Sequence, residues 1–421
     1  MSGGARAEAA DGPSDAPAVG MPGGRARMPG PRRYGALRPG DRVAVVAPSG
    51  PVEPERLEAG CAVLRDLGLD VAVGEHALDQ VNLGTPERVR TPLGSGSSNS
   101  QGSRPTSLRT LPGGGTPDPQ GSRPESVRDD WQRLAGSDAD RAADLQAAWC
   151  DPRVRAVVCA RGGYGATRVL DHLDWDALAA ATAESAERGG APKILHGSSD
   201  ITALHAAFAA RLGVTTSFGP MPAGRIADLG PILSGNVPTS DDPDGADTLD
   251  GLRAGLFRDG PAAVRGTRAL RPGHAEGPLT GGTLTLLTAL LGTPYASPPA
   301  AGRIVFLEDV AEAPYRIDRM LVQLLQAGYF DGAAGIALGS WERSGDPAEL
   351  DSVFTARLGP LGVPVLAGVP AGHGPRQRTL ELGAPARLDG DALTLSFEPP
   401  RASGGPLPDG VLTLEAPGGA R

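Results

Sequence analysis

Short aliphatic runs alternate with amphipathic stretches through the first half of the chain. Residues 42–48 (RVAVVAP) are almost continuously aliphatic, as in a strand buried on both faces, and residues 51–67 repeat apolar residues at helical spacing. The alternation continues, with strands expected at 71–73, 156–160 and 194–197 and helices at 138–149, 165–173 and 201–212. This order predicts an α/β fold with a doubly wound parallel sheet, whose functional residues lie at the carboxyl ends of the strands.

A second unit begins near residue 277. Its pattern predicts an apolar helix at 281–291, strands at 303–307, 335–338 and 363–366, and a helix at 315–327. The stretch 226–275 before it is rich in Gly, Pro and Asp, and we expect it to form a linker or a long crossing loop.

Two segments have the composition of chains that do not fold. Residues 1–33 and 93–128 contain too few aliphatic side chains to offset the entropy of ordering them. The second carries an imperfect duplication, QGSRPTSLR from Gln101 and QGSRPESVR from Gln120, which we interpret as a tolerated insertion. We therefore expect a disordered tail (1–33), an N-terminal α/β domain (34–225) with an insertion (93–128), a linker or crossing loop (226–275), a C-terminal domain (276–400) and a tail or last strand (401–421).

The net charge and the cysteines narrow the class of partner and compartment. The formal net charge is -9, whereas nucleic acid and anionic membranes require a basic face, so we expect a small-molecule or peptide substrate. Cys61, Cys150 and Cys159 fit neither a disulfide framework nor zinc-ligand spacing. No apolar stretch approaches the about 18 residues of a membrane span, and the N-terminus lacks an apolar signal region. These features favour a cytoplasmic protein.

The segment KILHGSSDIT, from Lys193 to Thr202, carries the strongest local signal for chemistry. A predicted strand turns within two residues into a predicted helix, with a hydroxyl at the corner. This is the geometry of a nucleophile elbow, in which the next backbone amide faces a developing oxyanion. A second interpretation is that Ser198 or Ser199 only caps the helix.

Three other features lie at the ends of predicted strands. RGGYG, from Arg161, follows strand 156–160, and its glycines would let backbone amides approach an oxyanion or phosphate, although a plain strand-to-helix turn explains them equally well. Glu308 and Asp309 follow an aliphatic run, and His373 lies in the glycine-rich loop PAGHGP. A serine, a carboxylate and a histidine are the nucleophile, orienting acid and base of acyl transfer.

The remaining histidines and acidic groups have simpler explanations. Asp171, His172, Asp174 and Asp176 could suggest a metal site, but alternating charges at helix ends explain them better. We expect the histidines other than His373 to have structural roles: His76, His172, His196, His205 and His274.

Five segments in combination resemble the LD-carboxypeptidases of serine peptidase family S66, a group that also includes self-immunity peptidases against microcin C. The resemblance covers nearly the whole ordered chain and rests on GDRVAVVAPSGPV at Gly40, RGGYGATRVLDHLDW at Arg161, GSSDIT at Gly197, GRIVFLEDVAEAPYRIDRML at Gly302 and VPAGHG at Val369.

The resemblance implies roles for single residues. The family's G-x-S-D nucleophile falls on Ser199, its relay acid on Glu308 and its histidine on His373. Its oxyanion hole falls on the backbone amides of Asp200 and of Gly162 or Gly163, between which the sequence does not decide. It further implies no metal or other cofactor, a doubly wound N-terminal domain joined to a smaller β-rich C-terminal domain, a triad assembled across their interface, and a homodimer.

Three positions depart from the family pattern. Ser198 stands where an aromatic residue is common, Gln377 where asparagine is expected, and His196 where an apolar strand residue is expected. Ser198 could widen or repolarise the site beside the nucleophile.

The expected activity is a metal-independent serine carboxypeptidase that releases a terminal D-amino acid from cytoplasmic murein tetrapeptides during peptidoglycan recycling. One alternative keeps the triad and moves the substrate to aminoacyl or aminoacyl-sulfamoyl adenylates, with Trp131 or Trp341 as the aromatic platform for the base. Another alternative is a non-catalytic protein that binds a small ligand in the same fold.

Overall fold

The structure is a computed structural model, and it describes residues 32–82, 133–258 and 263–397. The expected tail 1–33, except its last two residues, the insertion 93–128 and the C-terminal segment 401–421 lie outside these residues. No helix in the described ranges is long and apolar enough to cross a membrane. All described residues belong to one compact unit, Pro31–Arg421.

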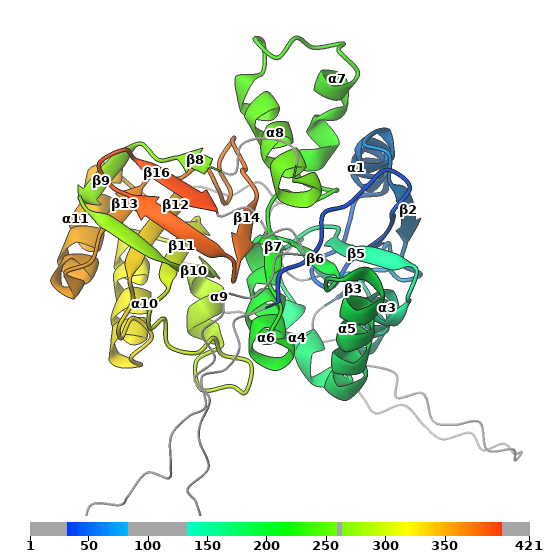
Figure 1. Cartoon of the computed structure of the whole chain (residues 1–421), viewed down its shortest axis with the longest axis horizontal. Helices are drawn as coiled ribbons and strands as arrows, with labels where there is room; N and C mark the ends of the chain where they lie inside the picture. Colours follow the sequence, from blue (N-terminus) through cyan, green and yellow to red (C-terminus); the bar gives the residue numbers. More distant parts are fainter. Residues whose placement is uncertain (1–31, 83–132, 259–262, 398–421) are drawn as a thin grey trace, which may run out of the picture. The chain divides into compact units, whose positions relative to one another are not determined.

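The first sheet has six strands in the order β14-β7-β6-β5-β1-β2 (Figure 1). Five of them run parallel, and β14 pairs with β7 in the antiparallel direction. The strands are β1 (Arg42–Val46), β2 (Asp70–Val73), β5 (Val154–Cys159), β6 (Ile194–Gly197), β7 (Thr216–Phe218) and β14 (Leu380–Leu382). A short hairpin pairs β3 (Val81–Asn82) with β4 (Arg133–Leu134).

Alternate residues of the central strands pack into two different cores, one on each face of this sheet. On one face Val43 and Val45 join the core formed with α1 and α8, and on the other Ala44 and Val46 join the core formed with α3, α4, α5 and α6. This is the doubly wound arrangement expected from near-continuous aliphatic strands. The helices are α1 (Pro54–Asp66), α3 (Asp138–Cys150), α4 (Ala166–Val169), α5 (Trp175–Gly189), α6 (Thr202–Leu212) and α8 (Pro243–Phe257).

The second sheet has eight strands in the order β8-β16-β15-β10-β11-β12-β13-β9. Its centre, β10 to β13, is parallel, and the outer strands pair antiparallel. Its strands are β8 (Ala263–Arg265), β9 (Arg268–Arg271), β10 (His274–Thr283), β11 (Ile304–Val310), β12 (Gly335–Glu342), β13 (Val365–Ala367), β15 (Pro385–Asp389) and β16 (Thr394–Phe397). The helices α9 (Leu284–Ala289), α10 (Pro314–Gln326) and α11 (Pro347–Leu358) supply apolar side chains to the core on one face. The predicted fold class, an α/β domain followed by a β-rich second sheet, is confirmed.

The two sheets are joined more closely than two consecutive domains would be. The chain returns from the second sheet to add β14 to the edge of the first. Phe218 of β7 and Leu380 of β14 share a core with Phe306 of β11 and Leu366 of β13. The carboxyl ends of β6 and β11 are therefore held in a fixed relation, and these are the strand ends that the sequence analysis singled out.

The structure differs from the sequence expectation in two places. The expected linker, 226–275, holds most of the short helix η4 (Arg225–Asp228), α7 (Gly230–Leu233), α8, β8, β9 and the first two residues of β10. Helix α8 starts at a capping aspartate, Asp242, whose Oδ1 accepts from the Gly245 amide at 2.8 Å, followed by proline at the first helical position. Aspartate and proline are helix-start signals as well as residues of linkers and loops, so the composition of this segment does not distinguish the two. The helix expected at 281–291 begins at Leu284, because β10 continues its pairing with β11 through Thr283.

Candidate active site

The turn between β6 and α6 places Ser199 at the carboxyl edge of the first sheet. Strand β6 ends at Gly197, and the short helix η3 (Ser199–Ile201) leads directly into α6. Ser199 has a φ of 60°, a left-handed conformation that costs a residue other than glycine roughly 1–3 kcal/mol. Ser198 makes no capping hydrogen bond with its side chain, and Ser199 turns its hydroxyl to a histidine. The local geometry is that of a nucleophile elbow rather than of a capping serine.

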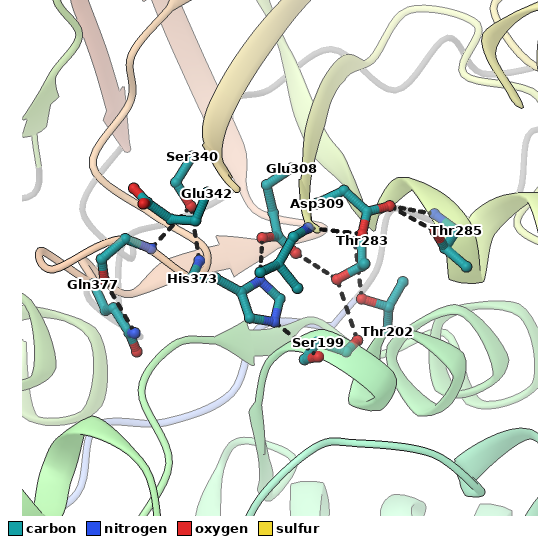
Figure 2. Close-up of polar contacts among 12 residues, drawn as sticks. Ser199, Thr202, Thr283, Thr285, Glu308, Asp309, Ser340, Glu342, His373 and Gln377 are labelled. Carbon is teal, nitrogen blue, oxygen red and sulfur yellow. Dashed lines mark hydrogen bonds and ion pairs between the residues drawn. The ribbon is translucent and has the colours of Figure 1, made fainter. Parts of the chain in front are cut away.

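Ser199, His373 and Glu308 form one chain of hydrogen bonds (Figure 2). Oγ of Ser199 lies 2.9 Å from Nε2 of His373, and Nδ1 of His373 lies 2.7 Å from Oε2 of Glu308. The serine comes from the first sheet, the glutamate from β11 and the histidine from the loop after β13. The fold thus brings His373 into contact with Glu308, which is 65 positions away along the sequence, and with Ser199, which is 174 positions away.

The surroundings of His373 make its ring a stronger base. Burial lowers the pKa of His373, but the charge of Glu308 and its hydrogen bond to Nδ1 outweigh burial and raise the pKa above the ordinary 6.5. Glu308 itself is fully buried, so its charge is poorly screened by water. A carboxylate in this position holds the proton on Nδ1 and leaves Nε2 free to accept the serine proton.

Thr283 connects the glutamate to the serine turn. Its hydroxyl donates to Oε1 of Glu308 and also lies 3.3 Å from the carbonyl oxygen of Ser199. Its backbone amide donates to Oγ1 of Thr202, the first residue of α6, at 3.0 Å. Thr283 ends β10, so this one residue of the second sheet contacts both Glu308 and the turn that carries Ser199 (Figure 2). The sequence analysis missed it, since a single threonine at a strand end carries no local signal.

We expect Thr283→Val to lower kcat for the reaction proposed below by about tenfold to a hundredfold. The valine keeps the shape of the side chain and removes a hydrogen bond to a buried carboxylate, which is worth about 1.5–3 kcal/mol. Steady-state kinetics measures the effect. Thr285→Val is the matched control, because the Thr285 hydroxyl bonds Asp309 instead, at 2.7 Å; equal losses in both variants would contradict a specific role for Thr283.

Asp309, next to Glu308, turns to a different partner. Its Oδ2 accepts from the backbone amide of Thr285 at 2.8 Å as well as from that hydroxyl, and burial raises the pKa of Asp309 to about 6. Figure 2 shows it directed away from His373, toward the start of α9. Of the two acidic residues at the end of this strand, only Glu308 contacts the histidine ring.

Ser340 anchors the histidine loop through hydrogen bonds to its backbone. Its Oγ accepts from the backbone amides of His373 at 2.7 Å and Gly374 at 3.0 Å. Gly372 has a φ of 116°, and a Cβ there would lie 2.5 Å from both Oε2 of Glu308 and Oγ of Ser340. The loop therefore needs glycine before the histidine. Ser340 was also missed from the sequence, because its role depends on strand register.

Gly162 is the member of the glycine pair that lies against Ser199. A Cβ on Gly162 would lie 2.8 Å from Cβ and 3.1 Å from Oγ of Ser199, and 3.3 Å from the amide nitrogen of Asp200. A Cβ on Gly163 would instead meet Gly50, at 3.5 Å from its Cα. Gly162 thus lies against the Ser199 side chain and near the Asp200 amide.

Two buried charged side chains fix the glycine loop. Oδ2 of Asp200 accepts from the Ser49 hydroxyl at 2.6 Å and from the Ala166 amide at 2.7 Å. Nη1 of Arg141 donates to the carbonyl oxygens of Pro48 at 2.5 Å and Gly165 at 2.9 Å. Both side chains therefore tie the loop after β1 to the loop after β5, and both lie behind the serine turn.

Replacing Gly162 by alanine is expected to lower kcat by about a hundredfold. The added methyl group would displace Ser199, and a shift of about 1 Å at a reacting group costs about that factor. A kinetic assay measures the loss of kcat, and a thermal melt of the same variant shows whether the loss comes from unfolding. Gly359→Ala is the control, since a Cβ there meets nothing within 4 Å. A Gly162→Ala variant with full activity would show that this glycine does not border the reacting atoms.

The histidines behind the turn are packed in the core. His196 Nε2 donates to the Pro220 carbonyl at 2.6 Å and its Nδ1 lies 2.8 Å from the Ser217 hydroxyl; His205 Nε2 donates to the Gly197 carbonyl at 2.9 Å. Burial lowers the pKa of each to about 4, so both rings are neutral near pH 7. They brace the carboxyl end of β6 and do not contact Ser199.

Among the described residues, the others singled out from the sequence make no hydrogen bond to Ser199. Gln377 donates through its side chain to the Gly374 carbonyl at 3.2 Å and so braces the histidine loop. Trp341 packs on Phe354, with 4.8 Å between ring centroids, in the core under α10 and α11. Trp131 lies outside the described residues. Ser198 is buried beside Ser199.

The chain matches known proteins along most of its length. Models of the LD-carboxypeptidase N-terminal and C-terminal domains match residues 114–219 and 276–388. A carboxypeptidase homologue of Streptomyces coelicolor is 43% identical over 372 residues, which cover 87% of this chain and 96% of that protein. The murein tetrapeptide carboxypeptidase of Pseudomonas aeruginosa is 34% identical over 270 residues, covering 63% of this chain and 83% of that one.

Solved structures share the fold at lower sequence identity. The structure of MccF in complex with glutamyl sulfamoyl guanosine superposes with a TM-score of 0.64 and 20% identity, and covers 88% of this chain and 99% of that chain. At this identity the likeness supports the arrangement of the two sheets alone.

Proposed function

We propose a reaction for this chain from the premise that it belongs to the LD-carboxypeptidase family of serine peptidases, as its two domain matches and its 43% identical relative establish. The reaction is hydrolysis of the amide between an L-centre and a terminal D-amino acid in a murein tetrapeptide. Ser199 is the nucleophile, His373 the general base and acid, and Glu308 the residue that orients the histidine. The enzyme acts in the cytoplasm, in peptidoglycan recycling, as a homodimer.

The observation that carries the proposal is the continuous chain from Glu308 through His373 to Ser199, with contacts of 2.7 and 2.9 Å. His373 Nε2 takes the proton of Ser199 Oγ as that oxygen attacks the carbonyl carbon. The tetrahedral oxyanion accepts hydrogen bonds from the Asp200 amide and from the loop at Gly162 and Gly163. His373 then gives its proton to the amine of the departing D-amino acid, which leaves an ester on Ser199.

The second half of the reaction uses the same groups. A water molecule gives a proton to His373 Nε2 and attacks the ester carbonyl, and the proton passes to Ser199 Oγ as the acyl group leaves. Glu308 stabilises the imidazolium in both halves, since its Oε2 lies 2.7 Å from Nδ1 of the ring. Every step uses residues of the chain and one water molecule.

Release of D-alanine from a murein tetrapeptide tests the proposed reaction. The purified chain should release D-alanine from a tetrapeptide ending in D-alanine and leave the same peptide ending in L-alanine intact. An aminoacyl-sulfamoyl adenylate serves as the competing substrate. No D-alanine release, together with cleavage of the adenylate, would move the activity to the alternative substrate class; cleavage of neither would overturn the proposal.

A further inference from the structure

A cavity lies at the amino ends of the strands of the first sheet, whereas Ser199 lies at their carboxyl ends. It is bounded by the end of α3, the start of β5, the second half of α5 and the residue before β6, and its volume is about 140 Å³. Ser199 follows the carboxyl end of β6, whereas this cavity opens beside the amino end of the same strand. It is therefore separate from the candidate active site. Its polar lining residues are Cys150, Arg155, Glu184, Ser185, Arg188 and Lys193.

The lining carries an excess of positive charge. Arg155, Arg188 and Lys193 face one carboxylate, Glu184, which pairs with Arg188 one helical turn away. Arg155 has no carboxylate partner in the described part of the chain. The lining therefore carries three cations against one carboxylate.

Lys193 is buried at the base of this group, with 2% of its surface exposed. Its ammonium donates to the carbonyl oxygen of Asp151, at the end of α3, which occupies one of its three N–H groups. The Asp151 carboxylate pairs instead with Arg153, at 2.7 Å. Capping of α3 explains the lysine contact and the ion pair with Glu184 explains Arg188, whereas Arg155 has no such contact among the described residues.

The cations disfavour one another in the unliganded protein. Burial lowers the pKa of Lys193 to about 8 against the opposing charge of Asp151, and the smaller effects of the Arg155 and Arg188 charges act in the same direction as burial. An anion in the cavity would relieve this repulsion. The cavity exceeds by far the about 10–15 Å³ that a single water molecule needs, so a tetrahedral oxyanion fits.

We propose that this cavity binds a phosphoryl dianion between Arg155, Arg188 and Lys193. Arginine forks and a lysine ammonium are the groups that bind phosphate oxygens, and the Ser185 hydroxyl offers a further donor at the wall. Inorganic phosphate and a phosphomonoester share this chemistry. Because the site joins α3, α5 and the starts of β5 and β6, its ligand stabilises the sheet that carries Ser199.

Calorimetric titration of the full chain with inorganic phosphate tests the site. Sodium chloride holds the ionic strength constant at about 0.15 M, which screens non-specific attraction. We expect one saturable site, and about tenfold weaker binding after Arg155→Ala, the factor for one lost charge-assisted hydrogen bond. Arg155→Lys should weaken binding less, because it keeps the charge and loses the fork. Glucose 6-phosphate, titrated in parallel, shows whether an esterified phosphoryl group is accepted as well as the free ion.

The matched control is Arg65→Ala. It removes the same charge from α1, which packs on the other face of the sheet. Phosphate binding should stay within twofold of the unmodified chain. Absence of saturable binding, or equal weakening by Arg65→Ala and Arg155→Ala, would overturn the site. A thermal melt of each variant establishes that it is folded.

Discussion

Ser199→Ala is expected to lower D-alanine release by about a millionfold in kcat. Loss of a catalytic serine costs about this factor in serine peptidases, and the remaining rate comes from binding and from the oxyanion donors. The side chain makes one hydrogen bond from its Oγ, to His373, so its removal should leave the melting temperature within a few degrees. Steady-state release of D-alanine from a tetrapeptide measures the effect.

Ser198→Ala is the matched control for this substitution. Ser198 precedes Ser199 in the same turn, is buried, and makes no capping hydrogen bond with its side chain. We expect Ser198→Ala to retain activity within about tenfold, since it removes no group in the proposed mechanism. Equal losses in the two variants would indicate that the turn is damaged and would leave Ser199 without a separate role.

Glu308→Gln should lower kcat by about ten thousandfold. The amide has nearly the shape of the carboxylate, but it neither fixes the required histidine tautomer nor stabilises the imidazolium, and the equivalent change in a serine peptidase triad costs about that factor. Thr283 Oγ1 and His373 Nδ1 both contact this carboxylate, so the variant tests the glutamate's part in the hydrogen bonds that lead to Ser199.

The same variant has a pH signature. His373 acts as a base only when neutral, so kcat/KM should fall as the pH drops through the pKa of His373, which Glu308 raises above 6.5. With glutamine in place of glutamate, burial is the largest remaining influence and outweighs the charge of Asp309, so the pKa falls and the acid limb of the profile should move to lower pH. Asp309→Asn is the comparison and should move the acid limb less, because Asp309 bonds Thr285 and acts on the ring only through its charge, more weakly than Glu308 does. An unmoved acid limb in Glu308→Gln would contradict the assignment.

Local sequence patterns predicted the turn of Ser199, the strand end of Glu308 and the loop of His373, but not the residues that hold them in place. A strand that becomes a helix within two residues predicts the exposed serine of a nucleophile elbow, and Ser199 has the left-handed φ that such a turn requires. Glu308 and His373 stand at a strand end and in a glycine-rich loop, both visible as composition. Thr283 and Ser340 act through register and through neighbours far away in the chain, and no local pattern encodes that.

The fold shows the same division. Aliphatic runs placed β1, β5, β6 and β11 because strands buried on both faces have a strong signal in short windows. The pairing partner of a strand is a different matter: β14 follows the histidine loop in sequence, yet it pairs with β7 of the first sheet. Helix α8 lies where composition predicts a linker or crossing loop, because Asp and Pro mark both loops and helix starts.

The central claim is that the Ser199 hydroxyl is activated by His373 and Glu308. Mass spectrometry after treatment with a fluorophosphonate tests it most directly, because such a reagent phosphonylates a serine only where a base removes its proton. The account predicts one phosphonate per chain, on Ser199, with D-alanine release lost in proportion, and a much slower reaction in Glu308→Gln. Labelling of another residue, or full D-alanine release from a chain fully labelled at Ser199, would contradict it.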